Sequence, residues 1–299
     1  TEGWMRRKHA RPGVIPLARK PSKKEELIAL LNEKDRRECR RSCRKFIKRH
    51  VKIEDLDSPG IVMPFRLWLG QLKALRAFLR KRLIVVLKAR QLGLTWLTLA
   101  YAAWRLIFTP GYRVVAISAN EDKAKELIRR MVFILEHLPP HIIRRRKGCD
   151  PRYTGPVYDD MSLSVTIYHR KGEPSIFQGL PATPGAGRMF TANLLLIDEW
   201  AEQQFARDIW TGAYPIVNRP TGGQVIGLST MVVGTLFDEI CQGAEEGTND
   251  FHEVFLDRWT DPRRDQEWFE KTKRAFPNSW RSEYPASPEE ARSVQKGAF

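Results

Sequence analysis

Short apolar runs alternate with longer amphipathic stretches along most of this chain. The runs that we interpret as strands are Leu83–Leu87, Tyr112–Ser118, Ser162–Tyr168, Asn193–Ile197, Gln224–Leu228 and Phe251–Leu256. The stretches with helical spacing are Leu72–Leu79, the run after Thr95 through Phe108, Glu121–His137, and shorter ones near Gln203–Gly212 and Leu236–Ala244. Strand–helix alternation of this kind predicts an α/β fold with a mostly parallel central sheet and helices on both faces.

The polar loop after the first apolar run has the form of a phosphate-binding loop. Its residues are Lys88, Ala89, Arg90, Gln91, Leu92, Gly93, Leu94 and Thr95. Backbone N–H groups and the positive end of the following helix dipole would converge there and stabilise an anion. Against the usual pattern G-x-x-x-x-G-K-[ST], Gly93 and Thr95 are in register, Lys88 replaces the first glycine, and Leu94 replaces the lysine. We expect Thr95 to bind Mg²⁺ and Lys88, with Arg90 beside it, to approach the phosphates. A plain strand–turn–helix is the alternative for this loop alone.

An acidic pair follows a second apolar run at the point where the predicted strand ends. Asp198 and Glu199 come directly after Asn193–Ile197, and α/β sheets bind ligands at the carboxyl ends of their strands. Asp198 could hold Mg²⁺, and Glu199 could accept a proton from the water that attacks the γ-phosphate of ATP. An exposed helix start with stabilising acids is the alternative. Together with the loop, the pair predicts ATP hydrolysis.

Composition indicates a polyanionic partner. The chain has 299 residues, of which 42% are hydrophobic, a formal net charge of +16 and a pI of about 9.9. Such an excess of cations attracts nucleic acid first and acidic lipid second. The cysteines (Cys39, Cys43, Cys149 and Cys241) show no C-x-x-C spacing, which favours reduced cytosolic thiols over zinc ligands. We expect no membrane span or signal peptide, since no apolar run has the necessary length.

We divide the chain into three parts. Residues 1–60 are expected to form a basic arm and one helix, which starts at the capping box Ser22-Lys23-Lys24-Glu25 and runs to about His50. Three interpretations of the Arg-rich face of that helix stay open: a solvated surface, a contact with DNA phosphates, or a docking surface for an acidic protein. A turn at Asp57-Ser58-Pro59-Gly60 leads into an ATPase core over 61–280, and 281–299 is a linker. Gln71, at a helix start ahead of the first strand, is a candidate contact for an adenine edge; its position alone favours the alternative of an ordinary helix start.

These motifs together resemble the large terminase subunits, the genome-packaging motors of tailed bacteriophages. KARQLGLT (Lys88–Thr95) is similar to the terminase phosphate loop, and LLLIDEWAE (Leu194–Glu202) to its acidic strand. GLSTMVVGT (Gly227–Thr235) looks like its coupling motif, with Met231 where many relatives have proline. SEYPASPEEARSVQKGAF (Ser282–Phe299) is similar to the linker before the terminase nuclease. The resemblance runs from about Met63 to Phe299 and implies a P-loop NTPase fold of the ASCE type with a basic N-terminal helical extension.

The resemblance also implies roles for individual residues. Gln71 would contact adenine, Thr95 and Asp198 would share the Mg²⁺ site, and Glu199 would be the catalytic base. Ser229 and Thr230 would couple the state of the γ-phosphate to movement. The catalytic arginine would be Arg188, reaching the ATP of a neighbouring subunit, or Arg90, acting within its own subunit. Because Leu94 lacks the usual lysine, the phosphate charge would be compensated by Lys88, Arg90 or both.

The function implied is a ring ATPase, a pentamer on the capsid and possibly a monomer in solution. It would drive double-stranded DNA into a procapsid in the host cytoplasm. Its expected partners are DNA, the portal protein and the small terminase subunit, and its cofactors are ATP and Mg²⁺. The nuclease would begin after this chain, so no DNA cleavage is expected from it. Candidate DNA contacts are Arg129, Arg130 and the basic loop Arg144–Lys147. The alternative for each is an exposed basic residue with no role in DNA binding. A helicase-like or restriction-type DNA translocase is one alternative, and a non-catalytic DNA- or portal-binding module is the other.

Overall fold

The computed structural model describes residues 22–55, 61–186, 188, 191–218, 220 and 222–293. The expectations for the arm at 1–21, the turn at 57–60 and the last residues, 294–299, therefore lie outside the described part of the chain. Among the described residues, none of the helices combines the length and the apolarity that a membrane crossing requires.

The expected mostly parallel sheet is confirmed. Nine strands follow the order β11-β3-β10-β9-β4-β8-β7-β6-β5 within the described residues. They are β3 (Leu83–Lys88), β4 (Arg113–Ser118), β5 (Arg144–Arg145), β6 (Val157–Met161), β7 (Ser164–Tyr168), β8 (Ser175–Pro181), β9 (Leu194–Ile197), β10 (Gln224–Ser229) and β11 (His252–Leu256). Only β7 runs against its two neighbours among these strands. A separate β1–β2 ribbon (Lys52–Glu54, Val62–Pro64) lies between α2 and α3 in sequence.

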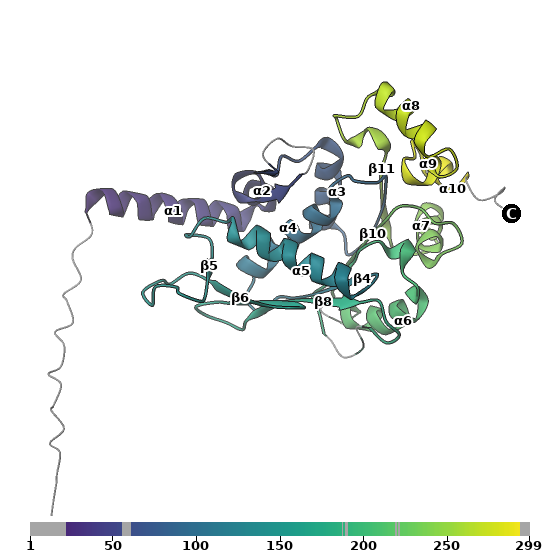
Figure 1. The fold of residues 1–299 in the computed structure, drawn as a ribbon. Coiled ribbons are helices and arrows are strands. Elements are labelled where there is room, and N and C mark those ends of the chain that lie inside the picture. Colours follow the sequence, from purple (N-terminus) through teal and green to yellow (C-terminus); the bar gives the residue numbers. More distant parts are fainter. Residues whose placement is uncertain are drawn as a thin grey trace, which may run out of the picture.

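Helices cover both faces of the sheet and divide the core into two layers (Figure 1). One layer contains α3 (Leu69–Arg80), α4 (Leu94–Phe108) and α5 (Glu121–Glu136), and the other contains α6 (Ala206–Val217) and α7 (Leu236–Glu246). Every residue of β3 is buried. Because side chains alternate along a strand, Ile84 and Val86 pack into the first layer and Val85 and Leu87 into the second. The uninterrupted apolar run in the sequence reflects this two-sided burial.

The prediction of one continuous helix from Ser22 to about His50 is wrong. The structure has α1 (Lys23–Arg41) and α2 (Cys43–His50), separated by Ser42 in an extended conformation with φ −146° and ψ 104°. The Ser42 hydroxyl accepts the backbone N–H of Lys45 at 3.2 Å and so caps a new helix. A serine side chain offers the backbone this alternative to a continuous helix. The capping box predicted at the start of α1 is confirmed.

Part of the Arg-rich face of this extension is engaged within the protein. The carboxylate of Asp35 lies 2.8 Å from the Arg49 guanidinium, 2.6 Å from His50 Nε2 and 2.8 Å from His141 Nε2. Arg49 also pairs with Glu38 at 2.7 Å. These contacts hold α1 against α2 and against the segment after α5, while the first turns of α1 project from the body (Figure 1).

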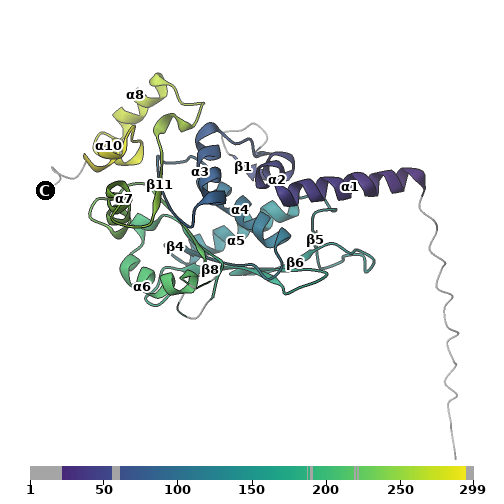
Figure 2. The same ribbon diagram turned by 180° about the vertical axis from the view of Figure 1, so that it is seen from behind.

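The C-terminal helices pack on the core through residue 292. They are α8 (Gln266–Ala275), α9 (Trp280–Glu283) and α10 (Pro288–Arg292), preceded by the short η2 (Arg258–Thr260). Buried Arg258 donates to the Tyr284 carbonyl at 2.7 Å and pairs with Glu290 at 2.7 Å. In Figure 2, α8 and α10 lie together above α7, next to one end of β11. The boundary expected near residue 281 remains a prediction; position 281 falls within α9, and α10 beyond it is anchored through Glu290.

Candidate nucleotide-binding site

The phosphate loop and the acidic pair lie at the same edge of the sheet. β10 pairs in parallel with β3 on one side and with β9 on the other, so that Gly227 is opposite both Val85 and Ile197. The loop after β3 and the residues after β9 are therefore neighbours although about a hundred positions separate them. One strand between these two elements is the arrangement expected for an ASCE-type P-loop fold.

Two left-handed residues shape the phosphate loop. Gln91 has φ +61° and Gly93 has φ +66°, and Gly93 is also the residue that precedes the first turn of α4. A Cβ at Gly93 would lie 3.1 Å from the amide nitrogen of Gln71, so a side chain there would be both strained and crowded. The start of α4 thus presents free backbone N–H groups to the loop.

A buried cation faces the acidic pair across this edge. Lys88 Nζ lies 3.3 Å from Glu199 Oε1, and the lysine side chain is only 6% exposed. Glu199 itself has φ +48°, an unusual backbone conformation for a residue with a side chain. Leu94, at the position of the usual lysine, is buried among core residues. The structure therefore places Lys88, and not position 94, as the ammonium at this site.

Thr95 and Asp198 meet on the other side of the loop. The Thr95 hydroxyl is 3.2 Å from Asp198 Oδ1 and 3.3 Å from Oδ2. Burial, followed by the charge of Glu199, raises the pKa of Asp198 to about 6, while Lys88 and the Thr95 hydroxyl act in the opposite direction. A bound Mg²⁺ would stabilise the negative charge of this carboxylate. The Thr95 hydroxyl beside it would supply a second oxygen ligand. These residues fit the metal predicted from the sequence.

Gln203 supports this pair, and the sequence analysis did not identify it. Its amide donates to the carbonyl of Asp198 at 3.0 Å. Six residues after the end of β9, it fixes the backbone from which Asp198 and Glu199 project. Its position just past an acidic strand end is the signal that could have suggested this role.

A cavity of about 590 Å³ opens next to the loop. Its lining includes Lys88, Arg90, Thr95, Glu199 and Gln71, together with apolar and aromatic side chains from the β1–β2 region and the start of α3. The volume is in the range of pockets for small-molecule ligands. The cavity therefore joins Lys88, Thr95 and Glu199 to an apolar compartment that could receive a base, while Asp198 lies behind Thr95 and outside the lining.

Gln71 is held between the apolar compartment and the phosphate loop. Its carbonyl oxygen accepts the Trp68 N–H at 3.0 Å, and its amide nitrogen donates to the Leu92 carbonyl at 2.9 Å. Each group retains a second hydrogen-bonding position, because an amide has two donor hydrogens and two acceptor lone pairs. The predicted adenine contact is thus compatible with this geometry, and the residue also braces the loop.

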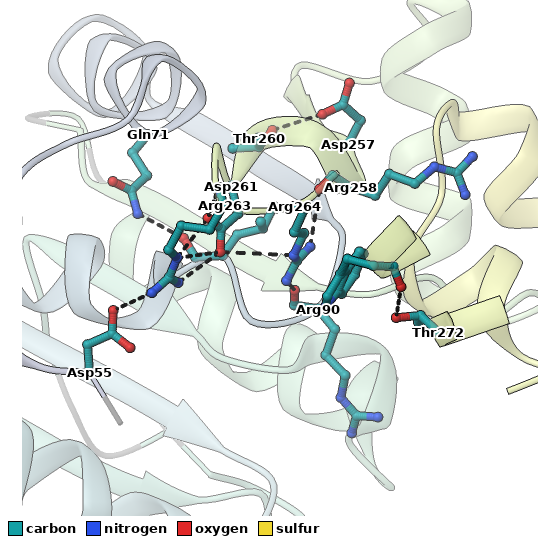
Figure 3. A network of polar contacts seen from close by, with 12 residues as sticks. Asp55, Gln71, Arg90, Asp257, Arg258, Thr260, Asp261, Arg263, Arg264 and Thr272 are labelled. Carbon is teal, nitrogen blue, oxygen red and sulfur yellow. Dashed lines mark hydrogen bonds and ion pairs between the residues drawn. The ribbon is translucent and has the colours of Figure 1, made fainter. Parts of the chain in front are cut away.

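Arg263, which the sequence analysis did not identify, forms part of the same compartment. It pairs with Asp261 and Asp55 at 2.8 Å each (Figure 3). Its guanidinium lies 5.3 Å from the centre of the Trp68 ring. Asp55 and Arg263 are 208 positions apart, so no local pattern could have indicated this contact. The ion pair joins the N-terminal β1 region to the C-terminal part of the chain beside the cavity.

Ser229 and Thr230, the predicted coupling residues, are buried and lie outside the cavity lining. The Ser229 hydroxyl accepts the backbone N–H of Ala201 at 3.1 Å. Ala201 follows the acidic pair by two residues. Ser229 is thereby connected to Glu199 through the backbone, and it does not face the phosphate loop directly.

The two candidate catalytic arginines differ in position. Arg188 is exposed, its side chain lies against Gly212 of α6, and it is not among the cavity residues. Arg90 lines the cavity, and its guanidinium is 3.3 Å from the carboxylate of Glu283. The structure thus brings Arg90 to the site of its own chain and leaves Arg188 on the surface.

The candidate DNA contacts are largely engaged within the protein. Arg130 lines the cavity beside the phosphate loop, lies 5.3 Å from the Trp96 ring centre and pairs with Glu126 at 2.8 Å. Ion pairs hold three of the others: Arg129 with Glu54 and Glu126, Arg145 with Asp160, and Arg146 with Asp159. Arg144 and Arg145 form the edge strand β5, where a loop was expected.

Comparison with known proteins identifies the fold. No protein-family model and no curated protein matches the sequence. Among solved structures, the large-terminase ATPase domain of Thermus phage P74-26 matches with a TM-score of 0.58 and 21% identity, over 75% of this chain and 94% of that one. The HK97 bacteriophage large terminase matches with a TM-score of 0.56 and 16% identity, over 86% of this chain and 51% of that one. This chain has the fold of a phage large-terminase ATPase domain.

The large terminase of a thermophilic bacteriophage, solved with ADP, is a further match. The TM-score is 0.52 at 12% identity, over 70% of this chain and 50% of that one. The chain thus spans about half the length of this protein and of the HK97 enzyme. The terminase ATPase fold agrees with the predicted resemblance and with the strand order around β3, β10 and β9.

Proposed function

We propose that this chain is the ATPase motor domain of a viral genome-packaging terminase, which hydrolyses ATP to move double-stranded DNA into a procapsid. The observation that carries the proposal is the meeting of two pairs at one sheet edge: Lys88 with Glu199, and Thr95 with Asp198. A phosphate-loop cation, a hydroxyl, a metal-binding carboxylate and a second carboxylate are the parts that phosphoryl transfer to water requires.

Each of these side chains has a defined task in the proposed reaction. Thr95 and Asp198 are the residues that would hold Mg²⁺, which would neutralise charge on the phosphates. Lys88 stabilises the negative charge of the terminal phosphate. Glu199 orients the attacking water and accepts its proton. The cavity next to Gln71 and Trp68 receives the base, with Gln71 supplying its remaining donor and acceptor to the adenine edge.

The DNA-translocating role rests on the terminase fold and on the net charge of +16. A motor must move any sequence, so its DNA contacts are to phosphates and its affinity weakens steeply with salt. The same proposal includes a ring on the capsid portal, the small terminase subunit as partner, the host cytoplasm as location, and no DNA cleavage by this domain.

Arg188 is proposed to act on the nucleotide of a neighbouring subunit. It is exposed and outside its own cavity, in a glycine-containing loop against α6. An arginine supplied from outside a site is worth about 10³–10⁵ in turnover. Mixing Arg188→Ala with Glu199→Gln subunits then restores part of the ATPase activity, because one interface of the mixed ring is complete. Complete loss in every mixture contradicts the role in trans.

Phosphate release, measured with and without double-stranded DNA, tests the proposed function. We expect Mg²⁺-dependent turnover by the wild-type protein, stimulated by DNA, and a loss of about 10²–10⁴ in Glu199→Gln. Glu267→Gln, at an exposed position of α8, is the matched control and should leave turnover unchanged. Folded wild-type protein without turnover under both conditions would instead favour a non-catalytic binding module.

A further inference from the structure

Two histidines from separate parts of the chain converge on one carboxylate oxygen where the N-terminal helices meet the body. His50 Nε2 lies 2.6 Å and His141 Nε2 lies 2.8 Å from Oδ2 of Asp35. Asp35 belongs to α1 and His50 ends α2, whereas His141 follows α5. In the part of the chain that the structure describes, this is the one group of three His, Cys, Asp or Glu side chains whose ligand atoms all lie within 4.8 Å of one another.

The other oxygen of the same carboxylate is held separately. Arg49 Nη1 lies 2.8 Å from Asp35 Oδ1, and Arg49 Nη2 lies 2.7 Å from Glu38. The guanidinium therefore fixes the orientation of Asp35 without occupying Oδ2, as the outer hydrogen-bonding partner of a ligating carboxylate does in metal sites. Because two carboxylates share the positive charge of Arg49, that charge opposes a cation at Oδ2 less than a free guanidinium would.

The backbone that carries His141 is also fixed by α1. The Arg36 guanidinium donates to the carbonyl of His141 at 3.1 Å and to the carbonyl of Ile142 at 3.2 Å. Arg36 directly follows Asp35, so one turn of α1 both supplies the carboxylate and holds the segment with the facing imidazole. The converging atoms are thus positioned by contacts other than those they make with one another.

A divalent transition metal fits this donor set. Zn²⁺ binds imidazole nitrogen at about 2.0–2.1 Å and carboxylate oxygen at about 2.0–2.2 Å. Tetrahedral geometry with these lengths separates donor atoms by about 3.3–3.5 Å, so each distance from Nε2 to Oδ2 would lengthen by about 0.5–0.9 Å. A neutral imidazole can carry its proton on Nδ1, which leaves the Nε2 lone pair for the metal. The imidazoles of His50 and His141 are 15% and 21% exposed, which gives water access to the fourth position.

We propose that Asp35, His50 and His141 form a zinc-binding site that fastens α1 and α2 to the body of the protein. One ion would join α1, α2 and the segment after α5 in place of the present hydrogen bonds. Cys39, whose Sγ faces the other oxygen, Oδ1, at 3.9 Å, is not a ligand in this proposal. The site is separate from the proposed Mg²⁺ site, and the inference depends neither on nucleotide binding nor on hydrolysis.

Calorimetric titration of the full chain with Zn²⁺, after treatment with a chelator and without nucleotide, tests the inference. We expect one site per chain with a Kd of about 1 μM or tighter. Excess Mg²⁺ should not compete, because it prefers oxygen ligands. His50→Gln and His141→Gln should each weaken binding by at least about a hundredfold, since a lost ligand costs more than a lost outer partner. His252→Gln, at an exposed position of β11, is the matched control and should keep the wild-type affinity.

Two calorimetric results would overturn the inference. One is absence of Zn²⁺ binding by the folded wild type, and the other is unchanged affinity in both histidine variants, which would leave only a hydrogen-bonded cluster. Circular dichroism checks that each variant is folded.

X-ray absorption at the zinc edge of the wild type decides the matter even if a variant fails to fold. Imidazole nitrogens at about 2.0–2.1 Å support the site, whereas sulfur at about 2.3 Å in their place would assign the zinc to a cysteine and overturn the inference. Because nucleotide is absent from every measurement, failure here is distinct from failure of the proposed function.

Discussion

Replacing Lys88 with methionine removes the buried ammonium that faces Glu199 and keeps most of the side-chain volume. In the structure this ammonium lies 3.3 Å from a carboxylate oxygen, and we take a similar distance for its contact with a phosphate. At that separation two unit charges interact by about 5 kcal/mol for an effective dielectric constant of about 20. Desolvation of the ammonium offsets part of this, which leaves about 3–4 kcal/mol.

The expected loss is therefore about 150- to 900-fold in kcat/KM for ATP. Steady-state phosphate release over a range of ATP concentrations measures it, with circular dichroism as the check on folding. Lys81→Met, at an exposed lysine just before β3, is the matched control and should stay close to the wild type. A folded Lys88→Met protein with kcat/KM within about threefold of the wild type would refute the reasoning, because the phosphate charge would then be compensated elsewhere.

Three further outcomes follow from contacts in the structure. Ser229→Ala removes the acceptor of the Ala201 N–H and should lower kcat about tenfold with little change in ATP affinity; an equal loss of affinity would contradict the coupling role. Gln71→Ala leaves two backbone groups without their partner and should raise the ATP dissociation constant about tenfold, measured by titration, whereas an unchanged value would exclude an adenine or loop contact. Burial, with the charge of Glu245 next, raises the pKa of Glu253 from 4.5 to about 7, so the free energy of unfolding of the wild type should fall as pH rises through that interval. Glu253→Gln should abolish this fall, on the order of 1–2 kcal/mol after solvent screening; denaturant unfolding at pH 5 and pH 8 measures it, with exposed Glu246→Gln as the control that keeps it.

Those parts of the site that depend on short-range patterns were predictable from the sequence. A buried strand that ends in Lys88 and a second one that ends at Asp198 and Glu199 each carry their chemistry within a few residues. Parallel strands bring such ends to one edge, so the meeting of Thr95 with Asp198 follows from the α/β alternation. The fold class could be predicted for the same reason.

The supporting contacts could not be predicted, because they join residues that are far apart in sequence and have no periodic signal. Arg263 reaches Asp55 across 208 positions, and Glu283 reaches Arg90 from a segment expected to be a linker. The sequence did contain one missed local signal, since Ser42 interrupts an otherwise helical pattern with a side chain that can cap. Strands β6 and β8 were also missed: β6 contains Asp159 and Asp160, and β8 contains Gly179 where it closely approaches α5.

Calorimetric titration of the purified, folded protein with ATP at millimolar concentration and Mg²⁺ tests most directly whether Lys88, Thr95, Asp198 and Glu199 form a working triphosphate site. The account predicts saturable binding at one site per chain, which requires Mg²⁺ and is strongly weakened in both Lys88→Met and Asp198→Asn. Absence of binding by the wild type, or binding that neither substitution affects, would contradict it.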